Sequence, residues 1–185
     1  MKKTSLILLI MCCCFASCKQ EKRVEIIYQE CLYNSLSDKG ESLKRYAKGF
    51  EMHLIALNIL KDSSAQSYYN IYKSIANGKH YPTHYKYSYI DSINKIEQYK
   101  INPNNKECLK YINSLEHYND SKIAKINKVQ FLLDEKESNN KFSEKVTKIL
   151  PIMEVKDFEL DYYKHKTFMF IYFSFLSKDL LLFNE

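Results

Sequence analysis

Apolar residues recur every three or four positions along most of the chain after residue 23, which is the spacing of one buried face of an α-helix. The clearest stripe consists of Leu43, Ala47, Phe50, Leu54 and Leu57. It predicts an amphipathic helix that follows a break at residues 37–40 and runs to about residue 61. Weaker stripes predict further helices over residues 24–36, 65–78, 85–96, 108–115, 121–133 and 142–149.

Polar and conformationally special residues separate these stripes. Ser63 and Gln66 have the spacing of a capping box, which predicts the start of the helix over residues 65–78. Gly78 can end that helix in a left-handed cap. Pro103 and Pro151 stop the helices that precede them, because proline disfavours helical geometry in the residue before it.

The C-terminal run from Phe168 to Leu176, FMFIYFSFL, is apolar on every side. It is too short to span a bilayer as a helix, so it is either a buried strand or the central helix of a bundle. The chain offers few partner strands, and we therefore expect a helix from about Phe158 to Phe183. A second membrane contact is the competing interpretation, which Lys178 and Asp179 disfavour.

The fold class that these patterns predict is all-α, an irregular helical bundle of about seven or eight helices. The chain has only three Gly and three Pro, which argues against a β protein with many turns. A short α-solenoid of helical hairpins is the alternative, because helix pairs begin near residues 24, 64 and 104.

The first eighteen residues, MKKTSLILLIMCCCFASC, have the order of a bacterial export signal. Lys2 and Lys3 form a positive n-region, and residues 6–15 form an uncharged apolar segment of the length of a signal-peptide core. Small residues then precede Cys18. Two alternatives are an ordinary signal peptide cut elsewhere, which would release a secreted protein, and an uncleaved N-terminal anchor.

The segment Phe15-Ala16-Ser17-Cys18 resembles the lipobox of bacterial lipoproteins, with Phe15 where a typical lipobox has Leu. The resemblance implies cleavage before Cys18 and lipid attachment to Cys18, which would hold the protein on a membrane. It divides the chain into a signal peptide (1–17), a lipidated Cys and tether (18–23) and a helical domain (24–185). Lys19, which is not Asp, implies the outer membrane, on its periplasmic or surface-exposed face.

Cys31 and Cys108 are the two cysteines of the expected helical domain. An exported protein meets an oxidising compartment, where an even pair of cysteines favours a disulfide. We therefore expect a bridge between them, against the alternative of two buried thiols that never meet.

The densest group of candidate ligand-binding side chains lies between residues 80 and 89. His80, Tyr81, His84, Tyr85 and Tyr89 predict a loop that binds a polar ligand, and the alternative is a loop whose tyrosines pack on the bundle. We expect no metal site there, because Pro82 disfavours the helix that two histidines four residues apart need, and no carboxylate lies within the segment.

Catalytic motifs are absent from the sequence, which has no Gly-x-Ser-x-Gly turn and no glycine-rich phosphate loop. Asp161 and His165 have the spacing of one helical turn and form the single candidate dyad, with a solvated helix start as the alternative. We expect no enzyme and no cofactor.

Arginine occurs only at positions 23 and 45, which argues against nucleic-acid recognition despite a formal net charge of +6. The expected function is binding of a protein partner in the cell envelope by a domain held on the membrane through Cys18. A carrier of a small apolar or polar ligand, with a pocket beneath residues 168–176, is the alternative.

Overall fold

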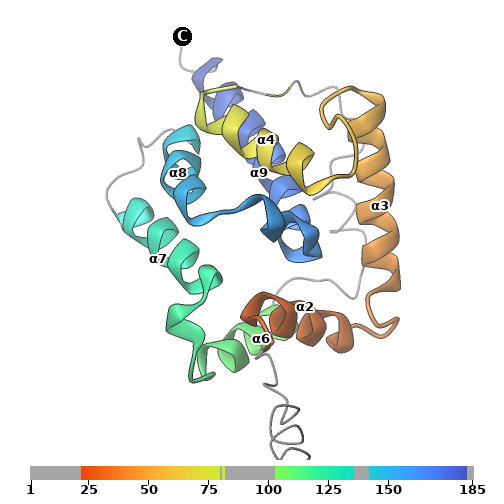
Figure 1. Ribbon diagram of the computed structural model, residues 1–185, viewed down its shortest axis with the longest axis vertical. Helices are drawn as coiled ribbons and strands as arrows, with labels where there is room; N and C mark the ends of the chain where they lie inside the picture. Colours follow the sequence, from red (N-terminus) through yellow and green to blue (C-terminus); the bar gives the residue numbers. More distant parts are fainter. Residues whose placement is uncertain (1–21, 80, 82–102, 136–141, 183–185) are drawn as a thin grey trace, which may run out of the picture.

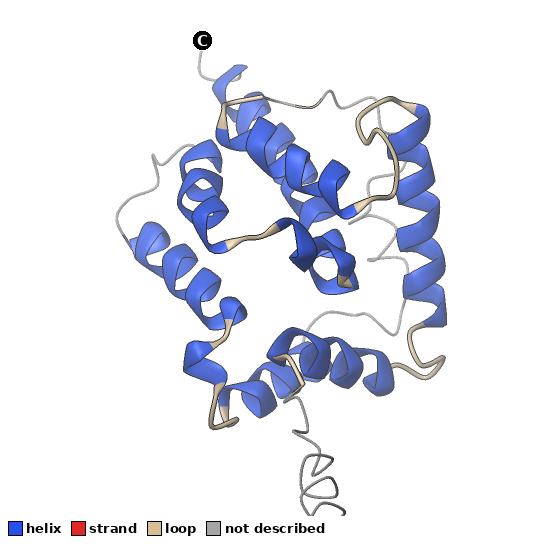
Figure 2. Cartoon of the chain, in the orientation of Figure 1, coloured by secondary structure: helices blue, strands red, loops and turns tan. Residues whose placement is uncertain are grey.

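Every regular element in the described part of the chain is helical (Figure 2). The computed structural model describes residues 22–79, 81, 103–135 and 142–182. Its α-helices are α2 (Val24–Ser35), α3 (Glu41–Ala56), α4 (Ala65–Ala76), α6 (Pro103–Asn113), α7 (Lys122–Glu135), α8 (Phe142–Ile149) and α9 (Asp161–Leu182). Three 3₁₀ helices, η2 (Tyr118–Asp120), η3 (Leu150–Ile152) and η4 (Val155–Glu159), connect them. The all-α prediction is confirmed.

Helices from distant parts of the sequence pack against one another around α9 and α4 (Figure 1). Helix α9 contacts α2, α4 and α8, and α4 also contacts η4. In a solenoid each repeat contacts only its neighbours, so these long-range contacts identify a bundle. Figure 1 shows α2 and α6 together at one end of the molecule, with α4 towards the other end.

Interlocking aromatic rings lie at the centre of a core whose other members are aliphatic. Phe168 of α9 lies 5.2 Å from Phe50 of α3, centroid to centroid, and 5.8 Å from Tyr68 of α4. The ring of Tyr72 lies 5.0 Å from the rings of both Phe158 and Phe170. Such aromatic pairs add about 0.5–1.5 kcal/mol each beyond the burial of their area. The apolar C-terminal run therefore lies in a helix, as expected, and Phe168, Phe170 and Ile171 at its start are buried in the core.

Two helix ends differ from the prediction. Helix α3 ends at Ala56, because the chain turns at Asn58, which has a positive φ of 56°. The turn leaves Leu57 exposed and buries Leu60 instead. The cap of α4 is Ser64 and not Ser63, since the Ser64 hydroxyl accepts a hydrogen bond from the Ser67 N–H.

The other differences lie in the second half of the chain. Helix α6 begins at Pro103, before the apolar stripe over residues 108–115 and close to the start near residue 104 that the spacing of helix pairs indicated. Proline suits the first turn of a helix, where its missing N–H has no intrahelical partner. Phe158 belongs to η4, and α9 begins three residues later, at Asp161. The helix predicted over residues 85–96 lies outside the described residues.

A tight turn joins α2 to α3. The Asp38 carboxylate accepts hydrogen bonds from the N–H groups of Gly40, at 3.0 Å, and Ser42, at 2.8 Å. Gly40 has a φ of +81°, and a Cβ atom there would lie 2.4 Å from the Cδ1 atom of Tyr33. Glycine is therefore required by both the backbone conformation and the neighbouring ring.

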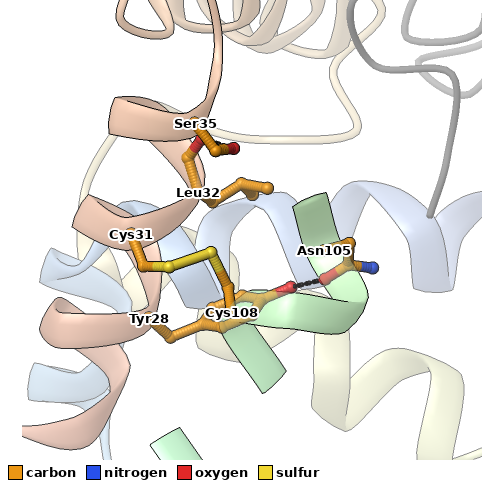
Figure 3. Close-up of a disulfide and its surroundings, with 6 residues drawn as sticks. All are labelled: Tyr28, Cys31, Leu32, Ser35, Asn105 and Cys108. Carbon is orange, nitrogen blue, oxygen red and sulfur yellow. Dashed lines mark hydrogen bonds between the residues drawn. A yellow bond between two sulfur atoms is a disulfide. The ribbon is translucent and has the colours of Figure 1, made fainter. Parts of the chain in front are cut away.

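A disulfide joins Cys31 of α2 to Cys108 of α6, with a Cα–Cα distance of 5.7 Å (Figure 3). Beside it, the Tyr28 hydroxyl donates a hydrogen bond to the Asn105 side-chain oxygen. Both contacts join the same two helices, so α6 is attached to α2 by a covalent bond as well as by packing.

Candidate functional site

A buried carboxylate holds the start of the domain in place. Asp157 of η4 has no solvent exposure, and its Oδ1 accepts a hydrogen bond from Arg23 Nη2 at 2.8 Å. Its Oδ2 accepts from Lys122 Nζ and from the Glu154 N–H, both at 2.7 Å. These contacts, which we call the Asp157 clamp, connect the residue before α2 to the first residue of α7 and to η4.

A second buried carboxylate extends the clamp to α9. Glu25 accepts a hydrogen bond from the Tyr163 hydroxyl at 2.8 Å and lies 3.4 Å from Arg23 Nε. Burial, and then the charge of Glu25, raise the pKa of Tyr163 well above its ordinary value, so this phenol remains a donor at any physiological pH. Arg23 is therefore fixed between two carboxylates on different helices.

A cleft of about 620 Å³ lies beside the clamp. It is lined by residues 22–25 and 27 around the start of α2, by residues 115–117 and 120–122 between α6 and α7, and by residues 154, 156 and 157 around η4. We call it the N-terminal cleft. Apolar side chains contribute to its lining through Val24, Ile27 and Leu115.

The charges around the N-terminal cleft nearly balance. Five carboxylates and four Lys or Arg side chains line it, together with His117. At its edge, Lys156 and then Lys122 lower the pKa of Glu154 to about 2 through hydrogen bonds. A surface with both signs of charge and with apolar positions can form ion pairs and apolar contacts with a polypeptide. It has no excess of cations to attract a phosphate.

A second, smaller pocket of about 250 Å³ lies where α3, α4 and α9 meet, and we call it the α3–α9 pocket. Its lining residues are Lys44, Ala47, Lys48, Glu51, Tyr68, Asp161, Lys164, His165 and Phe168. The Tyr68 hydroxyl donates a hydrogen bond to Glu51 Oε1 at 2.7 Å, and Lys48 pairs with Glu51 Oε2. Burial raises the pKa of Tyr68 well above its ordinary value, with the Glu51 hydrogen bond adding to the shift.

The candidate dyad of Asp161 and His165 lies in this second pocket. Burial lowers the pKa of His165 to about 4, an effect that the negative charge of Asp161 opposes. The imidazole is therefore neutral near pH 7, and its ring stacks on Phe168 with centroids 6.3 Å apart.

The other residues singled out from the sequence divide into two groups. Cys18, His80, His84, Tyr85 and Tyr89 lie outside the described residues. Tyr81 is described and is only 4% exposed, as a member of the main hydrophobic core. At this position the side chain packs on the bundle, which is the alternative considered for the loop.

Sequence reasoning singled out Asp161 and His165 of the α3–α9 pocket but missed the other residues that shape the pocket and the N-terminal cleft. Glu154 and Asp157 have the spacing of a capping box, and the structure contains that box at the start of η4. This local signal could have drawn attention to Asp157, although it carries no sign that Arg23 and Lys122 approach the same carboxylate. The contact between Glu51 and Tyr68 has no local signal.

Within the described ranges, no helix combines the length and the apolarity that crossing a membrane requires. In the same ranges, no group of three or more His, Cys, Asp or Glu side chains is placed to hold a metal ion. Comparisons of the chain with protein-family models, with curated proteins and with solved structures found no match.

Proposed function

We propose that this chain is a lipid-anchored protein of the bacterial cell envelope that binds a segment of a protein partner in the N-terminal cleft. The anchor is inferred from the lipobox-like segment that ends at Cys18. The disulfide between Cys31 and Cys108 supports export, because such bonds persist in oxidising compartments and are rare in the cytosol.

The observation that carries the proposal is the position of the cleft at the start of the domain. Lys22 and Arg23 line it, and Lys22 is four residues after Cys18. Four extended residues span at most about 14 Å. With Arg23 fixed by the Asp157 clamp, a lipid on Cys18 places the cleft close to the membrane surface, where it meets partners that are membrane-bound themselves.

The lining of the cleft favours a polypeptide as the occupant. Carboxylates and the side chains of lysine and arginine both line it, and Val24, Ile27 and Leu115 offer apolar contacts. A protein segment of mixed charge can satisfy both kinds of group, whereas an anionic headgroup meets carboxylates on the same surface. Because the residue after Cys18 is Lys19 and not Asp, we assign the anchor to the outer membrane.

Two measurements test the anchor and the cleft separately. Labelling with a fatty-acid analogue should mark the wild-type protein, and Cys18→Ala should abolish the label and release the protein from the membrane fraction. Label that persists in Cys18→Ala would remove the anchor from the proposal.

For the cleft, a photo-crosslinking amino acid placed at His117 in cells should give one discrete protein adduct. The same group at Asn70, an exposed position on α4 that does not line the N-terminal cleft, is the matched control and should not give that adduct. Lys156→Glu, a change at an exposed side chain of the cleft edge, should weaken the adduct from His117. Equal adducts from both positions, or adducts with lipid alone, would contradict the proposed protein partner.

A further inference from the structure

We propose that the α3–α9 pocket binds a small organic anion, with the negative group beside Lys164 and the apolar part against Phe168. This site is distinct from the N-terminal cleft, with which it shares no lining residue. The inference therefore stands whether or not the cleft binds a protein.

Two of the three lysines of the pocket are already paired with carboxylates, Lys44 with Glu41 and Lys48 with Glu51. The carboxylates that line the pocket are those of Glu51 and Asp161. Both oxygens of Glu51 are already engaged, one by the Tyr68 hydroxyl and the other by Lys48. An arriving anion thus meets the ammonium group of Lys164 with little competition from Glu51, and Asp161 is the other carboxylate of the pocket.

Lys164 is the cation best placed to meet such a ligand. Its Nζ lies 5.6 Å from the centre of the Tyr68 ring. Asp161 lines the same pocket, but among the described residues Lys164 forms no ion pair with it or with another carboxylate. The side chain is only partly exposed, so water screens it less than it screens a surface lysine. A ligand carboxylate there gains a charge-assisted hydrogen bond without breaking an existing ion pair.

The apolar part of the pocket lining consists of Ala47 and the rings of Tyr68 and Phe168, and the two rings are held in place. Phe168 packs against Phe50 and Tyr68, and Tyr68 is fixed in turn by its hydrogen bond to Glu51. A volume of about 250 Å³ suits a compound smaller than most drug-sized ligands. The chemistry that fits is one anionic group on a flat or compact apolar body, and benzoate is the simplest probe of that description.

The pH dependence of benzoate binding provides a second test, through His165. Its ring is neutral near pH 7, and a bound anion favours the protonated form of a neighbouring imidazole. Binding should therefore take up protons and become tighter as the pH is lowered from 7 towards 5.5, while benzoate stays ionised. The other ionisable groups that line the pocket are Lys44, Lys48 and Glu51 from α3, Tyr68 from α4, and Asp161 and Lys164 from α9. Comparison with His165→Asn isolates the contribution of the imidazole.

The experiment is a calorimetric and NMR titration of the full-length mature protein in detergent with benzoate, benzamide and inorganic phosphate. We expect benzoate to bind and to shift the resonances of the pocket, and benzamide, which lacks the charge, to bind at least about tenfold more weakly. Phosphate, which lacks the apolar body, should also bind more weakly than benzoate.

Two lysine variants make the test specific. Lys164→Gln should weaken benzoate binding about tenfold, the loss expected for one charge-assisted hydrogen bond. Lys73→Gln is the matched control, because Lys73 also lies over a tyrosine ring, that of Tyr69, but lines neither cleft. The proposal would be overturned if benzoate did not bind, if benzamide bound as tightly as benzoate, or if phosphate did. It would also be overturned if the two lysine variants weakened benzoate binding equally. Equal melting temperatures of the two variants verify that Lys164→Gln still folds.

Discussion

Replacing Asp157 by Asn tests whether the Asp157 clamp stabilises the fold. The change keeps the size of the side chain but removes its charge and places an amide NH₂ where one oxygen accepts two hydrogen bonds. Breaking a buried ion pair costs about 3–5 kcal/mol when the partner charge stays buried. The side chains of Arg23 and Lys122 are 34% and 24% exposed, so water partly solvates them after the change. We therefore expect the free energy of unfolding to fall by a smaller amount, about 2–3 kcal/mol.

Urea denaturation followed by circular dichroism measures this loss, and thermal melting should show a decrease of about 5–10 °C for a chain of this size. The matched control is Glu41→Gln, the same chemical change in the exposed Glu41–Lys44 pair, which should cost at most about 0.5 kcal/mol. The reasoning is refuted if Asp157→Asn and Glu41→Gln are equally stable. In a double-mutant cycle with Lys122→Met, the coupling energy should exceed about 0.5 kcal/mol, since the two side chains are in contact.

The remaining predictions concern the covalent, backbone and titrating features. Replacing both Cys31 and Cys108 by Ser should lower the free energy of unfolding by about 4 kcal/mol, and reductant should lower the wild type equally in urea titrations. Gly40→Ala should destabilise more than Gly78→Ala, because both glycines have positive φ but only the Cβ at Gly40 meets a neighbouring ring; equal melting temperatures would contradict this. Stability should fall as the pH drops from about 6.5 to about 4, because the unfolded chain protonates His165 while the folded chain keeps it neutral. His165→Asn should flatten that part of the urea-derived pH profile.

The helices could be predicted because their signals are local. Leu43, Ala47, Phe50 and Leu54 recur at helical spacing, and all four are buried in the structure. The run after Phe168 needed a further argument, since an apolar segment alone does not distinguish a strand from a helix. The scarcity of partner strands led to the correct choice.

Helix ends were predicted less well, because several residues compete for each end. Asp62, Ser63 and Ser64 can all accept a hydrogen bond from a helix N-terminus, and only the backbone geometry selects Ser64. Leu57 continues the apolar stripe of α3 in sequence, yet the turn at Asn58 removes it from the buried face.

Asp161 and His165, one helical turn apart, could be predicted as neighbours, but the rest of the candidate sites could not, because it depends on contacts between residues far apart in the chain. Arg23 and Asp157 are separated by 134 positions, and neither has a neighbour in sequence that indicates the other. Composition drew attention to residues 80–89 instead, where a run rich in histidine and tyrosine stands out. Tyr81, the one member of that group in the described part, belongs to the core.

The bridge between Cys31 and Cys108 also determines what a single backbone cut does to the molecule. The two cysteines are 77 positions apart, so the covalent ring that they close contains α3, α4 and the chain between them and α6. A protease that hydrolyses one peptide bond inside this ring opens it into a branched but continuous molecule. The product keeps its mass, apart from one added water, until a reductant separates the two fragments on a gel. A protease that cuts this interval once therefore releases no part of the chain.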